Sequence, residues 1–316
     1  MRNYHYKKNG AYAENESLPM QKLITAIVII TILCAILFPI GLLAQKPVYN
    51  KCAAENAVFE DRKDDNTGRS YKVKVEADQH GNAQGSQYDL AVDGAFEGQT
   101  VAVLHLYTGE GFDFELPKAA LKQKGFSVYR WINNPPSPQE LEEKLKKACQ
   151  LWIISSYEQK LTEEHLKVIK KFFESGKGVY IWGDNEPYYA DANAVARYLF
   201  DAEMLGNLPG NEVVGLNNKG KKVGLTPKHL ITTGLEYVFE GITIATIQDN
   251  KLFEPLIYGH EGNLVTAVYD HDGKRAVLDG GFTRLYCSWD NAGTGRYVKN
   301  AAAWLVNYER FGSAAK

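Results

Sequence analysis

The residues best placed to do chemistry are three polar ones, Asp184, Asn185 and Glu186, which follow Gly183 at the end of an apolar run. Residues 179–182 have the composition of a buried strand, and a helical pattern begins after a short turn that contains two tyrosines. In open parallel sheets, ligands bind beyond the carboxyl ends of the strands, where the free amide groups of the next helix attract anions. We therefore predict that all three residues contact a ligand, with Asp184 and Glu186 as the candidate acid or base groups.

The same residue types also suit a purely structural role. Asp184 or Asn185 would then close the turn and cap the helix that follows. Three aromatic residues nearby leave a similar choice open, because they form either a stacking wall for a sugar or peptide or part of the core: Trp182, Tyr188 and Tyr189. The sequence leaves these alternatives open for each residue, while the cluster as a whole indicates a pocket.

The elements that position this turn follow from the pattern between residues 100 and 200. Apolar runs predict strands at 101–107, 126–130, 151–154 and 178–182, and amphipathic patterns predict helices at 114–124, 137–148 and from 162 to about 175. Further strands are predicted at 242–247, 264–269 and 275–278, the last two joined by a hairpin turn, before a final helix at 297–308. Such alternation predicts an α/β fold with a mostly parallel, flavodoxin-like sheet and helices on both faces.

A parallel sheet brings the loops after its strands to one edge. Ser155 follows the third predicted strand, Asp184, Asn185 and Glu186 follow the fourth, and Arg284 follows the closing strand. We therefore predict that the first four line one cleft. Arg284 is predicted on its rim, where it could pair with a carboxylate or phosphate.

Several segments resemble the class I glutamine amidotransferase-like fold. They are Leu151-Trp-Ile-Ile-Ser-Ser156, residues 161–178 ending in Ser-Gly-Lys-Gly, Gly178-Val-Tyr-Ile-Trp-Gly183, residues 228–235, and Ala276-Val-Leu-Asp-Gly-Gly281 followed by a helix with Ala303-Trp-Leu305. More narrowly, the layout from Val101 to Tyr308 is similar to a non-catalytic group that contains the GldG and intraflagellar-transport-52 type domains and the related trehalose-utilisation proteins.

The chain departs from the catalytic pattern that this resemblance implies. Amidotransferases place a cysteine nucleophile at the turn after this strand and supply a His and a Glu later in the chain. Here the turn holds Asp184, no His-x-Glu pair occurs near the end, and the nearest cysteine, Cys149, precedes a different strand. A thiolate relay needs a thiol within reach of an imidazole. Glutaminase activity is therefore not expected.

These observations predict a domain that binds a small ligand or a protein partner without turning it over, and they call for no cofactor. Two alternatives stay open. In the first, the chain is a hydrolase of an envelope sugar or peptide that uses Asp184 or Glu186 as general base. In the second, it is an assembly subunit of a membrane complex.

Metal and disulfide chemistry have little support in the spacing. Four histidines show no HxH or HExxH pattern, so no metal site is predicted: His105, His229, His260 and His271. The cysteines outside the apolar segment show no CxxC pattern, and the sequence leaves a Cys149–Cys287 disulfide open.

One segment is not globular. Residues 23–44 are 22 residues without a charge, which is long enough to span a bilayer as a helix. Four basic residues precede the segment and two follow closely, which places the amino end in the cytoplasm and the main domain outside it. The alternative is a secretory peptide that starts at Met20 and is cleaved after Ala44, which would release the domain. We favour the uncleaved, single-pass anchor because of its length.

The predicted organisation is therefore a tail at 1–22, an anchor at 23–44, a polar spacer at 45–98 and an amidotransferase-like α/β domain at 99–312. Residues 71–76 in the spacer alternate like an exposed strand and suggest a hairpin. The formal charge of −2 over 316 residues argues against nucleic acid as a partner, because such domains usually carry a clear basic excess.

Overall fold

The computed structural model describes residues 58–63, 67–75, 89–217, 222–289 and 293–307. The predicted anchor at 23–44 lies outside these ranges, and within them no helix is long and apolar enough to cross a membrane.

In the predicted spacer, strand β1 (Val58–Lys63) pairs with β2 (Ser70–Val75) in an antiparallel ladder. This pairing confirms the hairpin suggested by the alternating pattern at residues 71–76.

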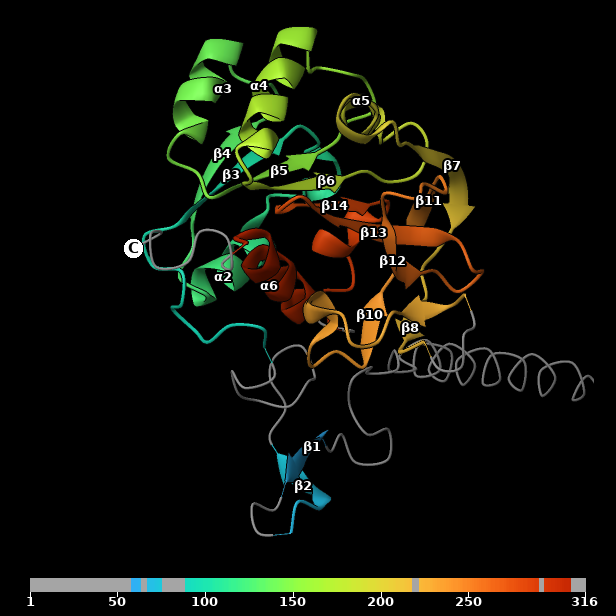
Figure 1. Cartoon of the computed structure of the whole chain (residues 1–316). Coiled ribbons are helices and arrows are strands. Elements are labelled where there is room, and N and C mark those ends of the chain that lie inside the picture. The colour runs from blue at the N-terminus through green and yellow to red at the C-terminus, as the bar shows by residue number, and fades with distance from the viewer. Residues whose placement is uncertain (1–57, 64–66, 76–88, 218–221, 290–292, 308–316) are drawn as a thin grey trace, which may run out of the picture. The chain divides into compact units, whose positions relative to one another are not determined.

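The domain is built on one eight-stranded sheet (Figure 1). Its strands lie in the order β4 (Ser127–Ile132), β3 (Thr100–His105), β5 (Gln150–Ile154), β6 (Gly178–Trp182), β14 (Lys274–Asp279), β13 (Leu264–His271), β12 (Glu254–Tyr258) and β9 (Gly224–Leu225). The first five are mutually parallel, and each of the last three pairs with its neighbours in antiparallel orientation. The structure thus confirms the predicted mostly parallel α/β sheet.

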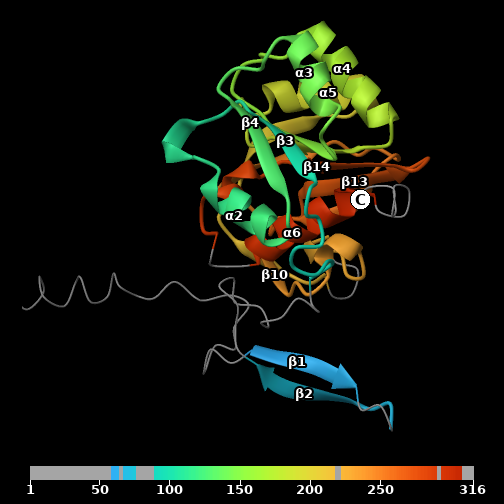
Figure 2. The ribbon, with the colours of Figure 1, turned by 90° about the vertical axis from the view of Figure 1, so that its left-hand side faces the viewer.

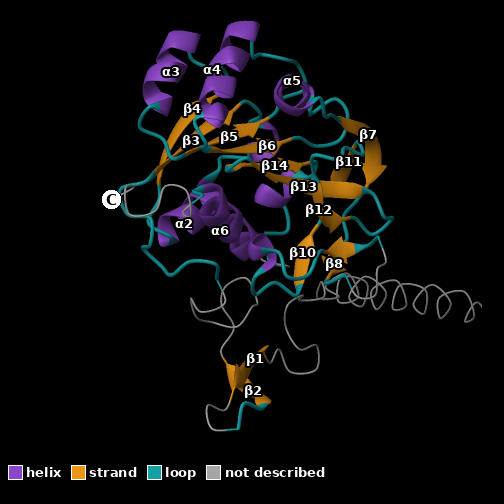
Figure 3. Ribbon diagram, in the orientation of Figure 1, coloured by secondary structure: helices purple, strands orange, loops and turns teal. Residues whose placement is uncertain are grey.

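Helices cover both faces of this sheet (Figure 3). One face carries α3 (Pro138–Leu145), α4 (Glu163–Glu174) and α5 (Ala190–Phe200), and the other carries α2 (Glu115–Gln123) and α6 (Thr294–Leu305), which also lie together in Figure 2. Strands β5 and β6 are buried along their whole length, which explains the continuous apolar runs at residues 151–154 and 179–182. Tyr180 and Trp182 stack at 4.1 Å between ring centroids on the face covered by α2 and α6.

The region after Phe200 mixes predicted and unpredicted strands. Strand β11 (Thr243–Ile247) matches the strand predicted at 242–247, but its antiparallel partner β7 (Met204–Pro209) and the short antiparallel pair β8 (Val213–Gly215) and β10 (Tyr237–Phe239) were not predicted. The predicted hairpin turn is present between β13 and β14, where Asp272 and Gly273 both have positive φ, as a type I′ turn requires. Helix α6 begins at Thr294, three residues before the predicted start at 297.

A buried charged cluster ties the residues before β3 to α2 and α6. The Asp89 carboxylate lies 2.6 Å from Arg296 Nε, 2.7 Å from Lys124 Nζ and 3.4 Å from Lys299 Nζ, and all four side chains are at most 4% exposed. Burial alone would raise the pKa of Asp89, but the charges of Arg296, Lys124 and Lys299 hold it below its usual range. The cluster therefore stabilises the folded state only while Asp89 is ionised.

We expect Asp89→Asn to destabilise the domain by about 3–5 kcal/mol at pH 7, because it leaves three cations without their buried partner. The folded-state pKa is depressed, so this contribution is fully present above the unfolded-state pKa near 3.8 and is lost as the pH falls through the folded-state value. Denaturant unfolding of wild type and variant between pH 3 and pH 8 measures both effects. Asp93→Asn is the matched control, because Asp93 pairs with the same lysine but is 53% exposed, and it should cost less than about 1 kcal/mol.

Candidate functional site

The candidate site lies at the carboxyl edge of the parallel strands. Strand β5 pairs in parallel with β6, and β6 pairs in parallel with β14. The loops that begin at Ser155, Gly183 and Gly280 therefore leave the sheet at the same edge. This confirms that Ser155 and Asp184 share an edge and that the segment after the closing strand joins them.

Ser155 lies beneath this edge and not on its surface. Its side chain is fully buried, and its Oγ accepts hydrogen bonds from the amides of Asp191 (2.9 Å) and Ala192 (3.1 Å). These amides are at the start of α5, where they have no partner within the helix. Ser155 thus caps α5 from the neighbouring strand, a role that the sequence did not predict.

Asp184 occupies the turn after β6 and is only 2% exposed. Its Oδ1 has no hydrogen-bond partner among the described residues. Burial raises the pKa of Asp184 well above its usual range, although the backbone of Asn185 and the charge of Arg284 act in the opposite direction. Burial therefore favours the protonated form of this carboxyl, which can donate a hydrogen bond, over the ionised form that a general base requires. The capping alternative is wrong for Asp184, because Ser155 takes that role.

The next two residues differ from Asp184 in their surroundings. Asn185 is half-buried, and its Oδ1 accepts a hydrogen bond from Thr243 Oγ1 at 2.7 Å, which joins the turn to β11. Glu186 is exposed, and its backbone amide donates to Gly206 O at 2.9 Å. The two carboxyl groups of the predicted set therefore lie in different environments, one buried and one in solvent.

The predicted rim position of Arg284 is wrong. Arg284 lies in a 3₁₀ turn (Phe282–Leu285) and is completely buried. It pairs with Asp279 Oδ1 at 3.2 Å and donates to the carbonyls of Glu240 at 2.8 Å and Gly281 at 3.1 Å. A side chain at position 281 would collide with the Glu240 carbonyl and the guanidinium, so Gly281 allows the backbone to pack against Arg284.

Two tyrosines complete this buried network. Asp279 Oδ2 accepts hydrogen bonds from Tyr297 at 2.7 Å and from Tyr180 at 3.2 Å, and the two hydroxyl groups lie 2.5 Å apart. Burial raises the pKa of both tyrosines well above the usual range, so both stay protonated donors. Arg284 Nη1 has no hydrogen-bond partner in the described part of the chain.

Half-buried aromatic residues form the surface at this edge. Tyr107 lies 5.4 Å from Tyr188 and 5.0 Å from Phe282, measured between ring centroids. The hydroxyl of Tyr286 donates to Glu110 Oε2 at 3.3 Å. Of the aromatic residues predicted as a stacking wall, Tyr188 belongs to this surface and Tyr189 is also half-buried, whereas Trp182 is fully buried in the core. Tyr107 follows the first predicted strand, so the sequence already indicates its place at this edge, whereas the contribution of Tyr286 could have been predicted only with the neighbouring loops in place.

The two described cysteines are free, so the disulfide that the sequence left open is not formed. Cys149 precedes β5, at the opposite edge from Asp184, and burial raises its pKa to about 11. Cys287 is half-buried near the site, and its pKa is raised by burial and by the charges of Glu110 and Asp184.

Among the histidines, His105 is buried, and burial lowers its pKa to about 4. In the described ranges, no group of three or more His, Cys, Asp or Glu could hold a metal ion.

No protein-family model matches the chain, and no curated protein matches its sequence. Among solved structures, the chain is similar to a protein described as part of a GMP synthase from Thermoplasma acidophilum, with 10% identity over 68% of this chain and 96% of that chain and a TM-score of 0.46. A ThuA-like protein from Parabacteroides merdae gives 11% identity over 66% and 90%, with a TM-score of 0.44. An exo-β-1,4-mannosidase from an Opitutaceae bacterium gives 13% identity over 66% and 36%, with a TM-score of 0.38. The neighbours thus include amidotransferase-like folds, but likenesses this weak carry no argument about function.

We expect Asp184→Asn to stabilise the protein at pH 8 by about 1–3 kcal/mol, because wild type must keep this buried carboxyl protonated on folding. The folded-state pKa is raised, so the stability of wild type falls as the pH rises above the unfolded-state value near 3.8. The difference between the two proteins should therefore vanish below about pH 4. Thermal unfolding from pH 4 to pH 9 measures it.

The control for this prediction is Asp279→Asn in the same buried network. It should destabilise the protein by about 3–5 kcal/mol, since Arg284 would lose its charged partner. If Asp184→Asn were destabilising at pH 8, Asp184 would be an ionised, paired carboxylate, and the description of the site would be wrong.

Proposed function

We propose that the chain is a membrane-anchored, exported domain that binds its ligand at the carboxyl edge of the sheet without turning it over. The observation that carries this proposal is the environment of Asp184. This residue stands at the turn where a nucleophile would be placed, yet it is 2% exposed, burial raises its pKa well above the usual range, and its Oδ1 has no partner among the described residues. Such a group can recognise a ligand by a hydrogen bond, but it is poorly suited to attack one.

The same environment argues against hydrolysis with Asp184 as the general base. A base must be ionised near the working pH and must reach the proton that it removes. Burial opposes the ionisation of Asp184, and Glu186 is exposed and lies outside the buried environment of Asp184. Neither of the two described thiols suits a nucleophile at this turn, because Cys149 lies at the opposite edge and the pKa of Cys287 is raised.

The surface above Asp184 suggests the class of ligand. Tyr107, Tyr188 and Tyr286 offer ring surfaces and hydroxyl groups, and the exposed Glu110 gives the edge a negative charge. Aromatic side chains with a polar tip suit partners that present apolar faces and hydroxyl or amide groups. A neutral sugar or a peptide fits this surface better than an anion does.

We expect members of a panel of neutral oligosaccharides and short peptides to bind the full chain in saturation-transfer NMR. Tyr188→Ala should weaken such binding at least about tenfold, which corresponds to 1.4 kcal/mol. Tyr198→Ala is the matched control, because Tyr198 lies on α5 outside the site and is 36% exposed. The same samples, assayed for hydrolysis, should leave every bound compound intact.

Hydrolysis that Asp184→Asn abolishes would overturn the proposal in favour of the hydrolase alternative. Binding that Tyr188→Ala and Tyr198→Ala weaken equally would place the ligand elsewhere. Failure of a folded chain to retain any panel compound would make a role in the assembly of a membrane complex the better account.

The anchoring part of the proposal rests on residues 23–44, which lie outside the described residues. We expect the full chain to stay in the membrane pellet after alkaline extraction and a chain lacking 23–44 to be released. Protease added from outside should digest the domain in intact spheroplasts or cells, as the basic residues before the span indicate. An amino terminus directly after Ala44 would instead show cleavage and secretion.

A further inference from the structure

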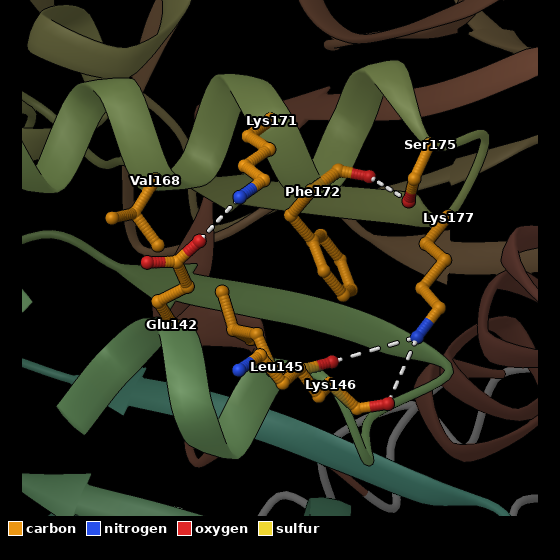
Figure 4. Close-up of a pocket in the computed structure, with 8 residues that line it drawn as sticks. All are labelled: Glu142, Leu145, Lys146, Val168, Lys171, Phe172, Ser175 and Lys177. Atoms are coloured by element: carbon orange, nitrogen blue, oxygen red, sulfur yellow. Dashed lines mark hydrogen bonds and ion pairs between the residues drawn. The ribbon is translucent and has the colours of Figure 1, made fainter. Parts of the chain in front are cut away.

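A groove lies between α3 and α4, at the opposite edge of the sheet from Asp184 (Figure 4). It has a volume of about 260 Å³ and runs beside the end of α3 and the second half of α4. Its floor is apolar and consists of Leu145, Val168 and Phe172. From Val168 to Ser175 the chain advances by seven residues, so the groove is about 10 Å long. These dimensions suit a single hydrocarbon chain better than a ring system.

The rim of the groove is cationic. Lys146, Lys171, Lys177 and Glu142 together give it a formal charge of +2. Lys171 Nζ lies 2.6 Å from Glu142 Oε1 across the groove, a contact seen in Figure 4. This pair is exposed to solvent, as is the pair that Lys146 makes with Glu143. Exposed pairs contribute little to stability, so a ligand anion can replace these carboxylates at small cost.

The carboxyl ends of α3 and α4 do not repel an anion in this groove, because side chains satisfy their free carbonyl groups. The carboxyl end of a helix carries partial negative charge, which by itself would repel one. Lys177 Nζ donates to Ala148 O at 2.7 Å and lies 3.5 Å from the carbonyls of Leu145 and Lys146, which offsets this charge at the end of α3. At the end of α4, Asn307 Nδ2 donates to Gly176 O, and Ser175 Oγ donates to Phe172 O.

We propose that this groove binds a monoalkyl anion, with the alkyl chain on the Leu145–Val168–Phe172 floor and a carboxylate or phosphate at the lysine rim. Burial of methylene groups supplies the affinity, at about 0.8 kcal/mol for each. The lysines supply the selectivity for a negative head group over a neutral or positive one. The site is separate from the carboxyl edge and does not depend on the function proposed for it.

The test is calorimetric titration of the full chain, held in amphipol so that no free detergent competes. The probes are decanoate, decyl phosphate, decyl glucoside and decyltrimethylammonium, which share one chain length and differ in head group. We expect at least one of the two anions to bind about tenfold or more tightly than the glucoside, and the cation not to bind. A preference for decanoate would indicate a fatty acid, and a preference for decyl phosphate would indicate a monoalkyl phosphate.

Variants separate this site from general charge attraction. Lys146→Glu changes a 61% exposed residue, so it should fold, and it should weaken anion binding at least about tenfold. Lys167→Glu makes the same change at a 57% exposed lysine of α4 outside the groove and should have no effect. Val168→Trp should fill the groove and abolish binding of every probe. Equal binding of anion and glucoside, equal effects of the two lysine variants, or no binding of either anion would overturn the proposal.

Discussion

The buried ion pair between Asp279 and Arg284 is the interaction on which the candidate site depends. Asp279 ends β14, Arg284 lies in the turn that follows, and Tyr180 of β6 and Tyr297 of α6 donate to the same carboxylate. Taking both charges out of water costs several kcal/mol, which only good geometry and further hydrogen bonds offset. The network provides these contacts and in doing so fixes the end of β14 against β6 and α6.

The pair also affects the pKa of Asp184. Arg284 is the cation whose charge acts on Asp184, but its hydrogen bonds go to Asp279 and to the carbonyls of Glu240 and Gly281. The Asp184 carboxyl is therefore buried without a full ion pair, and desolvation dominates its pKa. Burial at the turn after β6 consequently favours the protonated acid over the ionised carboxylate, which is why we propose recognition of a ligand and not its conversion.

Much of the sheet could be predicted from the sequence, because its central strands are buried on both faces. Residues 151–154 of β5 and 179–182 of β6 appear as uninterrupted apolar runs. Helix α3 begins at Ser137-Pro138, where the serine Oγ accepts a hydrogen bond from the amide of Glu140. Strands such as β8 and β10 could not be predicted, because they are three residues long and partly exposed, so they lack a clear period. Their pairing depends on contacts between distant segments and not on local pattern.

The site was predictable in its place but not in its chemistry. The parallel order alone brings Ser155 and Asp184 to one edge. The burial of Arg284 could not be predicted, because most arginines lie at the surface and its partners Glu240 and Tyr297 are distant in sequence. Ser155 likewise acts on the start of α5, which only the packed fold brings within hydrogen-bond distance.

The most direct test of this account is the protonation state of Asp184. In the full chain labelled with ¹³C at the aspartate side chains, the Asp184 carboxyl signal can be assigned by its loss in Asp184→Asn and followed through a pH titration. Our account predicts that this signal keeps the chemical shift of a protonated carboxyl at pH 7. A signal that titrates near the ordinary aspartate pKa, so that Asp184 is ionised at pH 7, would contradict the neutral acid at the turn and the binding function built on it.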